Sequence, residues 1–169
     1  AHEFVGSDEA EPRREGVEGR GGPAEREGSL MYPVYIGGSF KARARIKLMA
    51  EELEHRNYKV LSKWFDDNYF VEKAWDENFN GEVAETMARV DFSQLLQAKM
   101  VVIDTLDQSS TGGYHTELGL ALMRSYFHPL RVVHIGPRNN VFQNLVLEHY
   151  DSWEEFLNKG VSFWLEEQQ

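Results

Sequence analysis

The chain has no cysteine among its 169 residues, and this absence removes several kinds of chemistry. Disulfides, thiolate zinc sites, iron–sulfur clusters and a cysteine nucleophile are all excluded. Any nucleophile must therefore be an oxygen or a nitrogen atom. The sequence also lacks an H-E-x-x-H or H-x-x-x-H cluster of histidines, so we expect no catalytic metal, and we expect no other cofactor.

Positive charge is scarce. Only 18 Lys and Arg oppose 28 Asp and Glu, and the net charge of −10 predicts no binding to duplex nucleic acid, which is a polyanion. No apolar run approaches the ~20 residues of a membrane-spanning helix, and the first residues show no apolar signal segment. We therefore expect a cytoplasmic protein with no membrane partner.

The first 30 residues differ in composition from the rest of the chain. They hold eight acidic and four basic side chains, six of the 14 glycines, and almost no apolar periodicity. Such a segment cannot offset the entropy of ordering by burial. We predict that residues 1–30 are a disordered or expression-derived acidic tail, and that residues 31–169 form one domain of ordinary size.

Short apolar runs alternate with stretches of helical periodicity after residue 31. We predict strands over 33–36, 58–61, 100–103 and 130–135, and helices over 39–57, 82–98, 115–126 and 153–166. This alternation predicts an α/β fold: a single-domain, Rossmann/flavodoxin-like three-layer sandwich with a parallel sheet of about five strands. In such a fold, ligands bind outside the carboxyl ends of the strands.

Two acids are the strongest candidates for chemistry. Glu117 follows the Gly112-Gly113 pair in what we predict to be the first turn of a helix, where the helix dipole favours an ionised and approachable carboxylate. Asp91 lies between Val90 and Phe92, where partial desolvation would raise its pKa toward the range of a general acid. Each acid alone is more often an ordinary solvated side chain. If Glu117 and Asp91 lie close together, they form the pair of carboxyl groups that cleavage at an anomeric carbon requires, one as nucleophile and one as acid.

Other residues are candidates for binding. The turn at Gly37 and Gly38, followed by Ser39 and Lys41, offers a hydroxyl and a cation for an anion, although the pattern is not a dinucleotide or P-loop fingerprint. The aromatic segment 63–80 includes Trp64 and Phe65, which are core residues or, beside the site, stacking partners for a planar base. The remaining candidates are the strand-end and loop residues Asp104, Ser110, Thr111, Gly113 and Asn140.

Three segments in register resemble one family. They are Val-Tyr-Ile-Gly-Gly-Ser-Phe at 34–40, Asp91 followed by Leu-Leu-Gln-Ala-Lys-Met-Val-Val-Ile at 95–103, and Gly-Gly-Tyr-His-Thr-Glu-Leu-Gly at 112–119. Together they resemble the nucleoside 2-deoxyribosyltransferase superfamily, which includes the 2-deoxynucleoside 5-phosphate N-hydrolases. The resemblance covers residues 32–160 and marks 31–169 as a deoxyribosyltransferase-like domain.

The resemblance implies a role for each residue. Glu117 would attack C1′ of the sugar and form a covalent glycosyl intermediate, Asp91 would assist departure of the base, and Tyr35 would hold the Glu117 carboxylate. It also implies a small-molecule nucleoside or nucleotide as substrate, with residues 109–112 lining the sugar or its 5′ group. The sugar then passes to water or to another base, and family members assemble as homodimers or higher homo-oligomers.

Two questions stay open at this point. The 38–41 segment and Thr111 favour a nucleotide over a nucleoside, but hydrolase and transferase are both compatible with the residues. The alternative to an enzyme is a nucleotide-sensing module that keeps the same pocket without turnover. A flavodoxin-like electron carrier would fit the fold alone, since fold does not fix function.

Overall fold

A computed structural model describes residues 31–66, 81–107 and 113–161. It shows five parallel strands, β1 (Tyr32–Gly38), β2 (Tyr58–Val60), β3 (Met100–Asp104), β4 (Arg131–Ile135) and β5 (Glu148–Tyr150), in the order β2-β1-β3-β4-β5. This order is that of flavodoxin-like sheets, and the predicted single-domain α/β fold is confirmed. The predicted tail at 1–30 lies outside the described residues.

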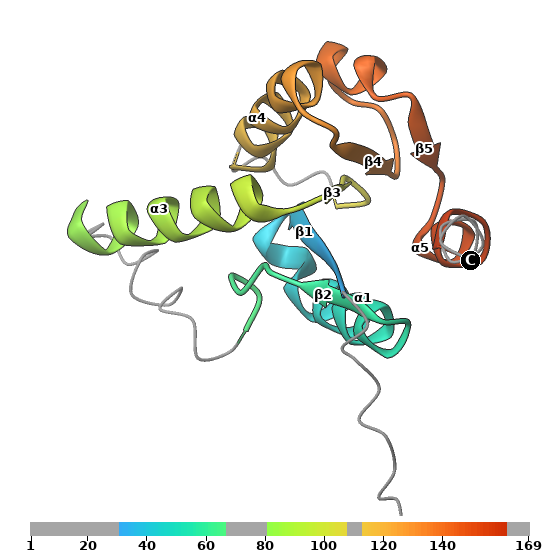
Figure 1. The fold of residues 1–169 in the computed structure, drawn as a ribbon, viewed down its shortest axis with the longest axis horizontal. Coiled ribbons are helices and arrows are strands. Elements are labelled where there is room, and N and C mark those ends of the chain that lie inside the picture. The colour runs from blue at the N-terminus through green and yellow to red at the C-terminus, as the bar shows by residue number, and fades with distance from the viewer. Residues whose placement is uncertain (1–30, 67–80, 108–112, 162–169) are drawn as a thin grey trace, which may run out of the picture.

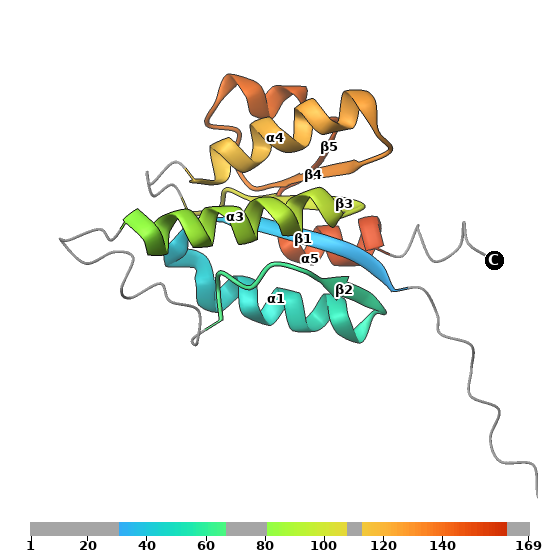
Figure 2. The ribbon, with the colours of Figure 1, turned by 60° about the vertical axis from the view of Figure 1, so that its left-hand side comes forward.

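Helices cover both faces of the sheet (Figure 1). The helices α1 (Arg43–His55) and α5 (Trp153–Glu155) lie on one face, with α5 continuing as the π-helix η3 (Phe156–Gly160). The helices α3 (Gly81–Gln97) and α4 (Gly113–Phe127) lie on the other face, and Figure 2 shows α3 running along the strands in front of the sheet, with α4 above it in this view. The molecule therefore has the three predicted layers.

Alternation along the strands divides the core into two clusters. In β1, Val34 and Ile36 pack with α1 and α5, whereas Tyr35 packs with α3 and α4. Successive side chains of a strand point to opposite faces, so each central strand serves both clusters. Every residue of β3 is buried, which confirms the prediction that 100–103 is a central strand.

Trp64 and Phe65 belong to the core on the α1 side. The Trp64 indole donates to the Ile36 carbonyl over 2.7 Å, and its ring meets Phe65 edge to face at 5.5 Å. Both rings are therefore core residues, which is the first of the two alternatives that the sequence leaves open for them. Residues 67–80 of the same aromatic segment lie outside the described residues.

Candidate functional site

The candidate site lies at the carboxyl ends of β1 and β3, where the strand order reverses direction. Gly37 and Gly38 of β1 pair with Ile103 and Asp104 of β3 at this edge. In open α/β sheets the crevice beside such a reversal is where ligands bind. The helix α4 begins at Gly113, and it carries Glu117 back over this edge.

A hydrogen bond from the sheet fixes the Glu117 carboxyl. The hydroxyl of Tyr35, a fully buried residue of β1, donates to Glu117 Oε1 over 2.8 Å. The two residues are far apart in sequence and are brought together because Tyr35 points to the α3/α4 face. The contact expected between Tyr35 and Glu117 is therefore present.

Gly37 leaves space for the second carboxyl oxygen. A methyl group at this glycine would overlap Glu117 Oε2 and would lie 2.9 Å from Ile103 Cδ1. The Gly37 backbone does not have a positive φ, so the reason for glycine here is room rather than conformation. The carboxyl of Glu117 thus lies directly against the backbone of β1.

Replacing Gly37 by Ala is expected to lower the free energy of unfolding by about 1–3 kcal/mol and to push the Glu117 carboxyl away from Tyr35. Gly119→Ala is the matched control. Gly119 lies on the same helix as Glu117, and a methyl group there would meet no atom within 4 Å. The control should raise stability by up to about 1 kcal/mol. Denaturant unfolding of both variants measures the difference, and equal effects would contradict the close approach.

The Glu117 carboxyl favours its neutral form. Burial raises the pKa of Glu117 to about 8, the Tyr35 hydrogen bond opposes this rise, and the negative charge of Asp91 adds to it. Its Oε2 is buried with no hydrogen-bond partner among the described residues, although the residue as a whole is half-buried. A carboxylate in such a place is poorly solvated and therefore reactive once it ionises.

The neutral form of Glu117 corrects the prediction that the helix dipole keeps this carboxyl ionised. The helix α4 begins at Gly113 rather than near His115, and its first turn contains no acidic residue. Glu117 therefore lies in the second turn, beyond the short reach of the helix dipole. Burial of the carboxyl outweighs the opposing Tyr35 hydrogen bond and any remaining dipole effect.

Glu117 and Asp91 share one cleft between α3 and α4. The cleft has a volume of about 310 Å³, and its lining comprises Ala88, Asp91, Phe92, Leu95, Gly113, Thr116, Glu117 and Leu120. The influence of the Asp91 charge on Glu117 shows that the two acids are within electrostatic range. The structure therefore brings together Asp91, Glu117 and Gly113, with Tyr35 and Gly37 behind them.

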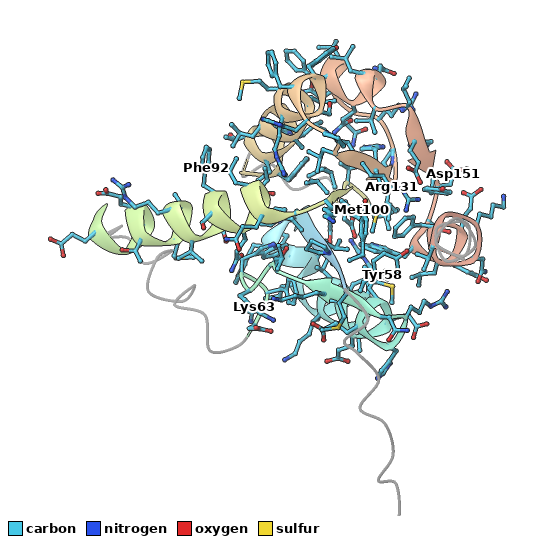
Figure 3. The ribbon with its side chains drawn as sticks, viewed as in Figure 1. Tyr58, Lys63, Phe92, Met100, Arg131 and Asp151 are labelled. Carbon is cyan, nitrogen blue, oxygen red and sulfur yellow. The ribbon has the colours of Figure 1, made fainter. Side chains whose placement is uncertain are left out.

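Sequence reasoning did not single out two residues of this cleft. Thr116 directly precedes Glu117 and is exposed at the helix surface. Phe92 directly follows Asp91, is 45% exposed, and leaves α3 on the side nearer α4 (Figure 3). The available signal was helical spacing, because residues 88, 91, 92 and 95 share one face of α3 and residues 113, 116, 117 and 120 share one face of α4.

Asp104 does not face this cleft, which corrects its prediction as a substrate-binding residue. Its carboxylate accepts from Arg45 at 3.1 Å, from the Trp153 indole at 2.6 Å and from the Leu106 backbone at 2.9 Å. It is fully buried on the α1/α5 face, opposite to Glu117. Protein donors already occupy both of its oxygens, so it holds the fold together.

The remaining candidates lie near the edge but make local contacts. Ser39 is buried and caps the 3-10 helix η1 (Phe40–Ala42) by accepting from the Lys41 backbone at 3.3 Å. A methyl at Gly38 would approach Ile46 Cδ1 to 2.6 Å, so this glycine packs toward α1. The Lys41 side chain is exposed.

Asn140 also has a local role. It caps η2 (Val141–Leu145), accepting from the Phe142 backbone at 2.8 Å, and Gln143 completes a capping box. This contact uses the side-chain oxygen of Asn140, and its role as a binding residue stays a prediction. Ser110 and Thr111 lie outside the described residues.

Two searches concern the described residues alone. No group of three or more His, Asp or Glu side chains there is arranged to hold a metal ion. Among the helices in residues 31–66, 81–107 and 113–161, none combines the length and apolar character that crossing a bilayer requires. Comparison of the whole chain with models of known protein families and with curated proteins gives no match.

Proposed function

We propose that the protein cleaves the N-glycosidic bond of a (deoxy)nucleoside or nucleoside 5′-phosphate through a covalent glycosyl–Glu117 intermediate. The observation that carries the proposal is the pair of carboxyl groups in one cleft, with Glu117 oriented by Tyr35. A pair of carboxyl groups at the bond to be cleaved is the arrangement by which glycosidases divide the nucleophile and acid roles. The resemblance to the nucleoside 2-deoxyribosyltransferase superfamily supports the same assignment of residues.

The reaction takes two displacements. Glu117 as carboxylate attacks C1′ of the sugar, the bond from C1′ to the base nitrogen breaks, and the base leaves with that electron pair and a proton from Asp91. Water or a second base then attacks C1′, Glu117 departs as carboxylate, and Asp91 recovers a proton from the attacking group. Each step inverts C1′, so the overall configuration is retained.

The direct test is an assay with deoxynucleosides and their 5′-phosphates side by side, with and without an added free base. Release of base alone identifies a hydrolase, and exchange of one base for another identifies a transferase. Tight binding of the substrate without product over hours would favour the alternative, a sensing module. Neither binding nor turnover with any of these substrates would refute the proposal.

The proton content of the acid pair predicts a pH profile. The first step needs one ionised and one protonated carboxyl, so the pair must hold a single proton. The reactive form carries this proton on Asp91 and leaves Glu117 ionised. The pair loses the proton as pH rises past about 8, the value to which burial raises the pKa of Glu117. We expect kcat/KM to fall about tenfold per pH unit above this value, and a flat profile from pH 7 to 10 would contradict the pairing.

We also propose that the protein works as a homodimer or higher homo-oligomer. Large apolar side chains are exposed on the outer faces of α3 and α4, at Phe92, Leu96, Met123 and Phe127. Exposed apolar patches of this kind mark interaction surfaces. Sedimentation that shows only monomers while activity is retained would contradict the proposal. The cytoplasmic location and the independence from cofactors stay predictions.

A further inference from the structure

Two histidines meet at the edge of the sheet away from the acid pair. His134 of β4 is fully buried, and His149 of β5 lies directly opposite to it in the strand register. The two rings stack with centroids 5.1 Å apart, and their Nδ1 atoms are separated by 2.9 Å. At that distance one Nδ1 must donate a proton and the other must accept it.

The contacts of Thr105 decide which histidine donates. Its Oγ1 lies 3.1 Å from the Ile135 carbonyl, 2.9 Å from the Pro137 carbonyl and 3.0 Å from His134 Nε2. Carbonyl oxygens only accept, so the hydroxyl proton goes to them and His134 Nε2 donates to Oγ1. Nδ1 of neutral His134 then carries no proton, and His149 must donate its own Nδ1 proton to it.

The series of hydrogen bonds from Thr105 through His134 to His149 ends at the protein surface. His149 Nε2 lies 3.3 Å from Asp151 Oδ1, and the Asp151 side chain is 93% exposed. His149 Nε2 therefore faces an exposed carboxylate, at the end of the hydrogen-bonded series farthest from Thr105. A proton on His134 Nδ1 would set a donor against the donor of His149.

We propose that the His134–His149 pair is an acid-operated latch for the edge strand β5, closed while His134 is neutral and opened when His134 takes a proton. The strand pairs with β4 through only three residues, so side-chain links between the two strands, namely the histidine pair and the Arg131–Glu148 ion pair, add to its attachment. Opening would also loosen α5, whose Trp153 donates to Asp104. Asp104 pairs in register with Gly38, so the latch connects acidity to the strand ends that carry the candidate site.

The charged groups around His134 favour the closed state. The pKa of His134 is lowered to about 4. Burial is the largest cause, the charges of His149 and Arg138 act in the same direction, and the charge of Asp104 opposes them. An opened His134 recovers its ordinary pKa of about 6.5, so the open state binds protons more readily. The closed state therefore loses its advantage as pH falls from about 6.5 toward 4.

Imidazole ¹⁵N NMR of the whole chain tests the proton assignment directly. At pH 7 we expect His134 protonated on Nε2 alone and His149 protonated on Nδ1. An Nδ1-protonated or doubly protonated His134 at pH 6 would overturn the latch. This readout needs no variant and no substrate, so its outcome is separate from that of the proposed activity.

Hydrogen exchange of the β5 amides, corrected for intrinsic rates, tests the opening. We expect the opening equilibrium to rise nearly tenfold per pH unit between about 6 and 4.5 in the natural sequence. His134→Asn keeps an acceptor for His149 but cannot titrate, and should remove this rise. His55→Gln, at an exposed histidine of α1, is the matched control and should keep it. Opening that does not depend on pH, or a rise that persists in His134→Asn, would refute the proposal.

Discussion

Glu117→Gln is expected to abolish base release, with a loss on the order of 10⁴-fold or more in kcat/KM, while the protein stays folded. The amide has the same shape and keeps an oxygen that can accept from Tyr35, but it cannot attack C1′. The buried site tolerates a neutral group because burial already favours the protonated acid. Chromatography of the released base and thermal unfolding of the same sample measure both parts of the expectation.

Asp91→Asn is the matched control for the role of each acid. It removes the proton donor and leaves the nucleophile, so activity should fall with ordinary bases but persist with a 7-methylpurine nucleoside. The base of that substrate is already cationic and leaves without a proton. Glu117→Gln should be inactive with both substrates. Full activity of Glu117→Gln with either substrate would end the assignment of the nucleophile.

Asp104→Ala should cause the largest loss of stability, about 3–5 kcal/mol in the free energy of unfolding. Removing this carboxylate leaves the Arg45 guanidinium, the Trp153 indole and the Leu106 backbone N–H without their shared acceptor. The cost of an abandoned buried donor exceeds the modest net value of the hydrogen bond itself. Urea unfolding followed by fluorescence gives the measurement.

Asp107→Asn provides the comparison for that loss. Asp107 lies 4.0 Å from the same Arg45, but its side chain is 40% exposed. A half-exposed ion pair contributes about 0–1 kcal/mol, so this variant should remain close to the natural sequence in stability. Similar losses for the two variants would show that Asp104 does not organise this face of the sheet.

The central strands and the two acids could be predicted because their signals are local. The continuous apolar run at 100–103 identifies a strand covered on both faces, and the structure has it fully buried. The fifth strand could not be located in the same way. Its residues, Glu148–Tyr150, are half-buried and mostly polar, and only their pairing with β4 makes them a strand.

The errors at the site concern the side of the sheet to which a side chain points and the groups that surround it in the fold. Asp104 follows Ile103, and alternation along β3 sends it to the α1/α5 side, away from Glu117. Strand alternation would have predicted this orientation of Asp104 once Ile103 was assigned to the α3/α4 face. The raised pKa of Glu117 could not be predicted in this way, because it comes mainly from burial of the carboxyl, which exists only in the folded chain.

The contact between Tyr35 and Glu117 joins residues 82 positions apart. During synthesis on the ribosome, the tyrosine emerges before its acceptor, and the strands β2 and β3 are made in the interval. The hydrogen bond from Tyr35 can therefore form only after α4 has left the exit tunnel. The acid pair is completed late in translation, so a nascent chain halted before that helix would hold a sheet without a reaction centre.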